Sequence, residues 1–202
     1  SGQSANNLRG NNIGVFVGIR NTEYYPPEKD RDPKNITFFS GMGTQLSAAS
    51  GRLSYFLGLT GPSLSIDTAC SASMTALHYA CESIRNNESD GALVGGVNII
   101  ISGENNVAAS QGNMLSSDGF CKTFSSKADG YVRSEGCAVF YLKPLKKAQL
   151  DGDPILSVIC ATGINQDGAS GGLTVPYGPA QENLIRKTLD KANLNPEDID
   201  YV

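Results

Sequence analysis

The sequence predicts an α/β layered fold, in which a parallel or mixed sheet carries helices on both faces. Continuous apolar runs at 13–18 and 92–101 are typical of strands that are covered on both sides. Between and after these runs, apolar residues recur at helical spacing over 71–85 and 179–192. Strands that alternate with helices in this way favour a layered sheet-and-helix architecture.

The first third of the chain contains one further predicted helix. Residues 21–34 have three prolines and mixed charges, which indicates a solvated loop. Between residues 38 and 59 the apolar residues fall at helical spacing among small ones, and we expect Gly51 to interrupt this helix or divide it in two. A short helix is predicted at 104–114.

The second half of the chain predicts a long polar loop and more strands. The stretch 116–136 is too polar and glycine-rich for core, and long ordered loops of this kind usually serve function. Residues 136–142 and 155–163 predict an antiparallel pair of strands joined by the turn-forming residues 151–154. Residues 199–202 resemble the beginning of another strand.

Charge and hydropathy exclude two classes of partner. The 202 residues include 16 basic and 20 acidic ones, a net charge of −4, and no basic cluster that would suit a nucleic acid. No apolar run is long enough to span a membrane, and the polar beginning of the chain has no signal-peptide core. We therefore expect neither a nucleic-acid nor a membrane partner.

The cysteines suggest a reducing compartment. There are five, an odd number at wide spacings, with no CxxC pair and no companion histidines for a metal site. Free thiols of this kind indicate a cytoplasmic protein without a metal centre. Four of them are predicted to be packing thiols, namely Cys81, Cys121, Cys137 and Cys160.

The fifth cysteine, Cys70, lies where a short strand turns into a helix. Leu64 and Ile66 alternate with the polar Ser65 and Asp67, as in a strand. Beyond the cysteine, one helix face carries Met74, Leu77, His78, Cys81 and Ile84. Unpaired backbone N–H groups and the helix dipole at a first turn favour a thiolate, which suits a nucleophile. The bend alone does not decide between a nucleophile and a small packing residue.

The local sequence around Cys70 adds a family resemblance. The run DTACSAS, from Asp67 to Ser73, resembles the nucleophile motif of β-ketoacyl synthases, and most closely that of polyketide-synthase ketosynthase domains. Ala72 departs from the pattern, because those domains often have serine there. Further blocks are similar to the family in the same order, at 51–63, 90–98, 114–145 and 164–176. The resemblance covers nearly the whole chain after its first dozen residues.

The resemblance implies the thiolase-like fold, which is built of two similar halves. Residues 1–202 resemble a partial ketosynthase domain, mostly its N-terminal half, without the first strand of the family and without its C-terminal half. In the family, segments beyond those similar to this chain carry two active-site histidines and a lysine. Truncation, cleavage or a partner chain that supplies the rest are open alternatives.

The resemblance also implies a two-stage acyl transfer. Cys70 attacks an acyl thioester carried on the phosphopantetheine of an acyl carrier protein, and a malonyl-type thioester then loses carbon dioxide and attacks the acyl-cysteine. The implied partners are an acyl carrier protein, a second copy in a homodimer, and remaining ketosynthase segments or other synthase domains, with no bound cofactor. The second stage needs the family's histidines, so we expect this chain alone to be acylated or alkylated without condensing.

The sole histidine cannot replace them. His78 lies eight residues beyond Cys70 on the same predicted helix, about 12 Å along the axis at roughly 1.5 Å per residue. Direct proton transfer needs a separation of about 3 Å. His78 is therefore predicted to have a packing role.

A few other residues carry weaker predictions. Thr174 resembles a family position near the pantetheine entrance, where its hydroxyl would bind the substrate arm, although an exposed strand-end threonine explains it equally well. The polar residues 165–167 are expected to bond their own backbone in a turn. Asp129, Arg133 and Glu135 are expected to form a polar network that braces the long loop.

Three functions are therefore compatible with the sequence. The first is an enzyme component, a β-ketoacyl synthase domain of polyketide or fatty-acid biosynthesis. The second is a ketosynthase-derived scaffold or dimerisation module without turnover, and the third is another acyltransferase on the same fold. The intact motif around Cys70 favours the first over the second, since a scaffold has no need of the nucleophile.

Overall fold

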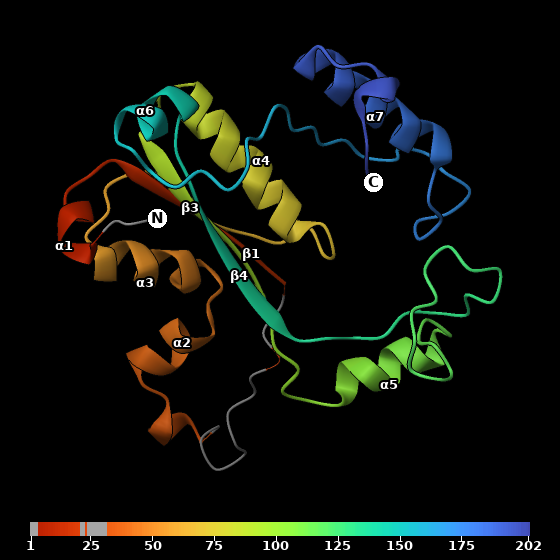
Figure 1. Ribbon diagram of the computed structural model, residues 1–202. Coiled ribbons are helices and arrows are strands. Elements are labelled where there is room, and N and C mark those ends of the chain that lie inside the picture. Colours follow the sequence, from red (N-terminus) through yellow and green to blue (C-terminus); the bar gives the residue numbers. More distant parts are fainter. Residues whose placement is uncertain (1–3, 21–22, 24–31) are drawn as a thin grey trace.

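A four-stranded sheet forms the centre of the described chain. The computed structural model describes residues 4–20, 23 and 32–202, so most of the loop predicted at 21–34 lies outside the described residues. The strands are β1 (Ile13–Ile19), β2 (Ser63–Ile66), β3 (Gly91–Asn98) and β4 (Gly136–Leu142). Their order in the sheet is β2-β1-β3-β4 (Figure 1).

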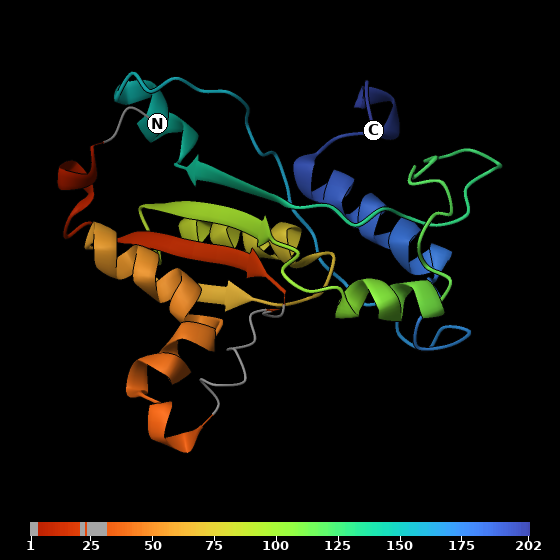
Figure 2. The same ribbon diagram turned by 90° about the horizontal axis from the view of Figure 1, so that it is seen from below.

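The sheet is mixed, as predicted. Strand β1 runs parallel to both β2 and β3, with Gly18 opposite Ile66 on one side and opposite Gly96 on the other. Strand β4 runs antiparallel to β3. The three parallel strands therefore end at the same edge of the sheet, where β4 begins (Figure 2).

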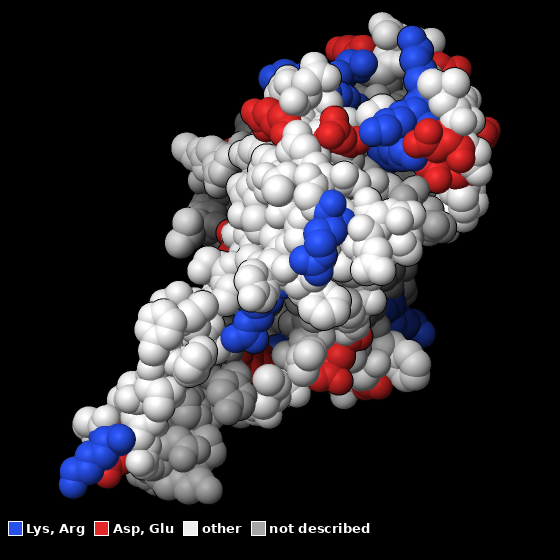
Figure 3. Space-filling view, turned by 90° about the vertical axis from the view of Figure 1, so that its left-hand side faces the viewer, with Lys and Arg blue, Asp and Glu red and all other residues white. Residues whose placement is uncertain are grey.

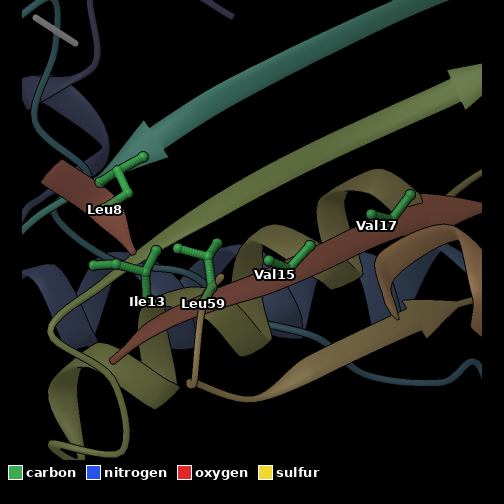
Figure 4. Packing of buried hydrophobic residues seen from close by; sticks show 5 residues of the cluster. All are labelled: Leu8, Ile13, Val15, Val17 and Leu59. Atoms are coloured by element: carbon green, nitrogen blue, oxygen red, sulfur yellow. The ribbon is translucent and has the colours of Figure 1, made fainter. Parts of the chain in front are cut away.

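Helices cover both faces of this sheet, which also confirms the prediction. Alternate residues of β1 point to opposite faces. On one face Val15 and Val17 pack with Leu59, which follows α3 (Ser47–Leu57), and Figure 4 shows this cluster. On the other face Phe16 packs against Ala76 and Ala80 of α4 (Ala72–Arg85). Burial on both sides explains why the β1 sequence is continuously apolar.

The break in the helical region at 38–59 is not at the predicted residue. The region forms α2 (Phe38–Thr44) and α3, separated at Gln45 and Leu46, whereas Gly51 lies inside α3. A glycine costs a helix only about 1 kcal/mol. That cost does not end a helix that is tied to β2 by the 3.0 Å hydrogen bond between the hydroxyls of Ser50 and Ser65, so the prediction for Gly51 is wrong.

Two later helices match their predictions. They are α5 (Glu104–Gln111) and α7 (Gly178–Ala192), whose end at Asn193 has the left-handed φ of 54°. Short elements that were not predicted are α1 (Ala5–Leu8), η2 (Pro33–Asn35), α6 (Leu145–Leu150) and η3 (Pro196–Asp198). In the described part of the chain, no helix combines the length and the apolar character needed to cross a bilayer.

The predicted pairing of 136–142 with 155–163 is wrong. Strand β4 pairs with β3 over its whole length, and within the described residues neither 155–163 nor 199–202 joins a strand. Instead, the first of these segments runs along α4, where the Arg85 guanidinium donates to the carbonyl of Cys160 at 3.2 Å (Figure 1). The apolar composition of 155–163 therefore indicates strand propensity, but it does not show which strand, if any, the segment pairs with.

Helix α4 begins in direct contact with the sheet, and two glycines allow it. A Cβ atom on Gly18 would lie 2.5 Å from the Cα of Ser73 and 2.6 Å from the carbonyl carbon of Ala72. A Cβ on Gly96 would lie 2.8 Å from the Cβ of Ser73. The first turn of α4 is therefore placed by contact of its backbone with β1 and of the Ser73 Cβ with β3, and these contacts also place Cys70 just before it.

We predict that Gly18→Ala destabilises the protein by about 1–3 kcal/mol, because the added methyl overlaps the backbone of α4. Gly51→Ala is the matched control, since it adds the same methyl inside a helix with nothing within 4 Å. It should stabilise by about 0.5–1 kcal/mol. Urea unfolding of both variants measures the difference, and equal free energies of unfolding would contradict the close contact.

Candidate active site

Cys70 lies at the bend between β2 and α4, as predicted. The chain reverses at Ala69, whose φ of 55° is in the left-handed region that non-glycine residues rarely adopt. The Asp67 carboxylate accepts a hydrogen bond from the N–H of Ala69 at 2.9 Å, and the carbonyl of Ala69 accepts from the N–H of Ala72 at 3.1 Å. These bonds hold the turn in a conformation that costs about 1–2 kcal/mol at a residue other than glycine.

Three hydroxyl groups tie this bend to the helix that follows. The Ser71 hydroxyl donates to the carbonyl of Thr68 at 2.8 Å and contacts the hydroxyl of Thr68 at 2.9 Å. The Thr68 hydroxyl in turn lies 3.1 Å from that of Thr75, which is buried on α4. The position of Cys70 is therefore set by the residues on both sides of it.

Cys70 is exposed and opens into a cleft of about 760 Å³. The cleft lies at the edge where the parallel strands end, a place where ligands commonly bind in α/β sheets. One side is apolar, with Met74 and Leu77 of α4 and Phe140 of β4. The polar residues of its lining are Arg20, Glu23, Ser73, Asn98, Asn105, Tyr131, Arg133, Ser134 and Glu135.

The polar side of the cleft is organised around Glu23, which the sequence analysis missed. Its carboxylate accepts hydrogen bonds from the Asn105 side chain at 2.7 Å and the Arg133 guanidinium at 2.6 Å. It also accepts from the backbone N–H groups of Ile101 and Ser102 at 3.0 and 3.2 Å. These donors, Asn105 and Arg133 first, lower the pKa of Glu23 from 4.5 to about 2. The carboxylate is therefore ionised at neutral pH.

The predicted network of Asp129, Arg133 and Glu135 exists as separate parts. The carboxylate of Glu135 accepts from the N–H of Ile100 at 2.7 Å. Asp129 instead pairs with Lys122 at 2.5 Å and accepts from the Ser117 hydroxyl at 2.6 Å, and these contacts hold its pKa below its usual range. The prediction of one network is therefore wrong: Asp129 alone braces the 116–130 loop, whereas Arg133 and Glu135 bond residues at the cleft.

His78 does not approach Cys70, as its helical spacing predicted. Its Nδ1 lies 2.9 Å from the hydroxyl of Thr162, and its ring packs edge-on against Tyr79. Burial, which disfavours the charged form, lowers the pKa of His78. It is not among the described residues that line the cleft. The prediction of a packing role is confirmed.

Thr174 lies exposed in a turn and is likewise absent from the described lining of the cleft. Its role toward the substrate arm stays a prediction.

The 165–167 segment bonds its own turn only through Gln166, whose side-chain oxygen accepts from the N–H of Gly168. Asn165 and Asp167 instead bond the beginning of α7, at the carbonyl of Ala180 and the N–H of Tyr177.

The remaining cysteines divide into two kinds. Cys81 is buried on α4, and burial raises the pKa of its thiol, so its prediction as a packing thiol is confirmed. Cys121, Cys137 and Cys160 are exposed, which corrects the same prediction for them. Cys137 also lines the cleft that contains Cys70. A strand pattern identifies β4 but does not show which neighbours cover it, so this exposure could not be found from the sequence.

We predict that Ala69→Val destabilises the protein by about 1–2 kcal/mol more than Ala69→Gly. A β-branched side chain fits the left-handed conformation poorly, whereas glycine adopts it without strain. Urea unfolding of the two variants measures the difference. Equal stabilities would show that residue 69 does not keep its positive φ in solution.

The lowered pKa of Glu23 predicts a pH-dependent stability. A carboxylate with a pKa near 2 when folded and 4.5 when unfolded stabilises the fold above the higher value. That contribution is lost as the pH falls from 4.5 toward 2. The difference in unfolding free energy between wild type and Glu23→Gln should therefore be constant near neutral pH and shrink in this window. Urea unfolding of the two proteins at a series of pH values measures this difference, and a difference that stays constant down to the acid end of the window would contradict the lowered pKa of Glu23.

Comparison with known proteins identifies the family of this chain. Residues 1–148 match the family model of the β-ketoacyl synthase N-terminal domain, and residues 156–202 match that of the C-terminal domain. The chain is 47% identical over its whole length to a phenolphthiocerol/phthiocerol polyketide synthase of Mycobacterium tuberculosis, of which it covers 9%. It is 45% identical to erythronolide synthase EryA3 of Saccharopolyspora erythraea, of which it covers 6%. The chain thus spans less than a tenth of these relatives.

Solved structures agree with the sequence comparisons. An oxazolomycin ketosynthase domain of Streptomyces albus superposes with a TM-score of 0.91 at 36% identity, over 98% of this chain and 34% of that one. The ketosynthase of module 6 of the bacillaene synthase of Bacillus subtilis gives a TM-score of 0.87 at 38% identity, with the same coverage. The fold of this chain thus has close counterparts among solved ketosynthases, and the chain belongs to the β-ketoacyl synthase family.

Proposed function

We propose that this chain provides the nucleophile of a β-ketoacyl synthase in polyketide biosynthesis. The observation that carries the proposal is the exposed Cys70, held by a strained turn at the start of α4 and open to a cleft of about 760 Å³. The open cysteine also counts against a scaffold without turnover, which would not need it. A substrate class of acyl thioesters fits the apolar side of the cleft, formed by Met74, Leu77 and Phe140.

In the first stage, the Cys70 sulfur attacks the carbonyl carbon of an acyl thioester carried on a phosphopantetheine arm. The new carbon–sulfur bond forms as the bond to the pantetheine sulfur breaks, and that sulfur leaves as a thiol after protonation. We assign the stabilisation of the developing oxyanion to backbone N–H groups at the bend, including that of Cys70. The acyl carrier protein is accordingly a proposed partner, and no resident cofactor is needed.

In the second stage, a malonyl-type thioester loses carbon dioxide and its carbanion attacks the carbonyl carbon of the acyl-cysteine. The new carbon–carbon bond forms as the bond to the Cys70 sulfur breaks, which lengthens the chain by two carbons and returns Cys70 as a thiol after protonation. This stage needs acid–base groups near the sulfur. His78, the sole histidine of the sequence, is bonded to Thr162 and lies outside the described lining of the cleft. We therefore propose that this polypeptide by itself accepts the acyl group and does not condense.

A homodimer is part of the proposal, and an apolar face supports it. Large apolar side chains of α2 and α3 are exposed, among them Phe38, Phe39, Tyr55 and Phe56. Figure 3, which views the side of the molecule that carries these helices, shows charged residues crowded at the upper end and a largely uncharged surface below it that is interrupted by isolated basic side chains. Contiguous exposed apolar surface is typical of association sites.

The five free thiols support a cytoplasmic location.

We predict that a limiting dose of iodoacetamide or of an acyl-pantetheine thioester modifies Cys70 before the other cysteines. The measurement is peptide mass spectrometry of the full chain at short times. Cys70→Ser should abolish the fast phase. Cys137→Ser is the matched control, because this cysteine lines the same cleft without the bend, and it should leave the fast phase unchanged. Equal labelling of Cys121, Cys137 and Cys160, which are also exposed, would contradict an activated nucleophile.

A further inference from the structure

Glu23 connects three chain segments that are distant in the sequence. It follows the last residue of β1, Ile19, by four positions. Two of its donors, Ile101 and Ser102, lie three and four residues beyond the end of β3, and Arg133 lies three residues before the start of β4. The carboxylate therefore joins the loops that leave or enter three neighbouring strands at one edge of the sheet.

The burial of this carboxylate makes its hydrogen bonds obligatory. The side chain of Glu23 is 7% exposed and that of Arg133 is 15% exposed. Leaving a buried carboxylate without its hydrogen-bond donors costs a large desolvation free energy. The loops that carry these donors are therefore kept in place by the carboxylate. Arg133 extends the connection, because its second nitrogen donates to the side chain of Asn106 at 2.6 Å.

The same residues are the polar wall of the cleft. Glu23, Asn105 and Arg133 all line the cleft that contains Cys70. The next residues along the wall are secured in the same way, since the Asn98 side chain donates to the carbonyl of Ser134 at 2.6 Å. By contrast, the bend at Cys70 is held by Asp67, Thr68 and Thr75, whose bonds at the bend do not involve Glu23. The wall and the nucleophile are therefore fixed by separate sets of contacts.

We propose that Glu23 is a positioning residue, which holds the polar wall of the cleft in the shape that admits an acyl-pantetheine thioester to the sulfur of Cys70. The inference rests on the proposed function of Cys70 and adds to it. Glu23 does not touch the reacting atoms in this scheme. It acts through Arg133, Asn105 and the backbone at 101 and 102.

The separation between wall and nucleophile defines the experiment. Iodoacetamide is small and needs only an accessible sulfur, whereas hexanoyl-pantetheine must fit the cleft. In the full chain, Glu23→Gln should lower the rate of Cys70 acylation by hexanoyl-pantetheine about tenfold, the factor expected from one lost charged hydrogen bond. The rate of alkylation by iodoacetamide should stay within about twofold of wild type. Both rates are read by mass spectrometry.

The control is an ion pair of similar burial outside the cleft. Lys143, whose side chain is 8% exposed, pairs with the carboxylates of Asp151 and Asp153 beside α6. Asp153→Asn should destabilise the fold and leave both rates within about twofold of wild type. An equal loss of acylation in Asp153→Asn would assign the effect of Glu23→Gln to general stability and overturn the inference.

A second variant and a second readout keep the test decisive. Asn105→Ala removes one donor and should slow acylation about threefold, and it replaces Glu23→Gln if that variant does not fold. Hydrogen exchange at the amides of Ile101 and Ser102 should accelerate in either variant, while exchange in the first turn of α4 should not change. If wild type accepts no hexanoyl group, the proposed function fails and the exchange rates alone judge the positioning role. Unchanged exchange at these two amides overturns the positioning role. If the wild type is acylated, an unchanged rate of acylation in the variant also overturns it.

Discussion

The close contact between the first turn of α4 and the sheet determines the rest of this structure. Gly18 and Gly96 have no side chains to hold the helix away from the strands, so the backbone at Ser73 lies directly on β1 and the Cβ of Ser73 lies against β3. Cohesion in such a contact comes from dispersion and from the burial of Phe16, Ala76 and Ala80 beside it. Any residue larger than glycine would lift the helix, and with it the turn that presents Cys70.

The cleft combines two kinds of support with different physical origins. The apolar packing beneath α4 is non-directional and tolerates small shifts, whereas the bonds at Glu23 are directional and require their donors at 2.6–3.2 Å. A hydrophobic core fixes where the helix lies, and a charged network fixes how the surrounding loops are shaped. In the proposed scheme, the reactivity of the Cys70 sulfur is therefore separable from the access of the substrate to it.

The elements that the sequence predicts correctly depend on residues that are close to one another along the chain. The strand at 13–19, the bend at Cys70 and the helix at 72–85 each have a local pattern of apolar and small residues. The failures came where contacts between distant segments outweighed a local pattern. Gly51 was expected to interrupt a helix or divide it in two, but α3 continues through it and is tied to β2 at Ser50. Residues 155–163 were expected to pair with β4, which pairs with β3 along its whole length.

The sequence by itself was enough to identify the family and to find the bend that carries Cys70. The residues around this cysteine are contiguous, and their chemistry depends on near neighbours in the chain. The folded arrangement was needed to show that Glu23 meets Arg133, 110 positions later, that Cys137 faces the same cleft as Cys70, and that the single histidine bonds Thr162. A lone carboxylate in a polar, proline-rich loop has no periodic signal. Its role arises from three strand ends meeting at one edge of a sheet, and sheet order depends on all the strands at once.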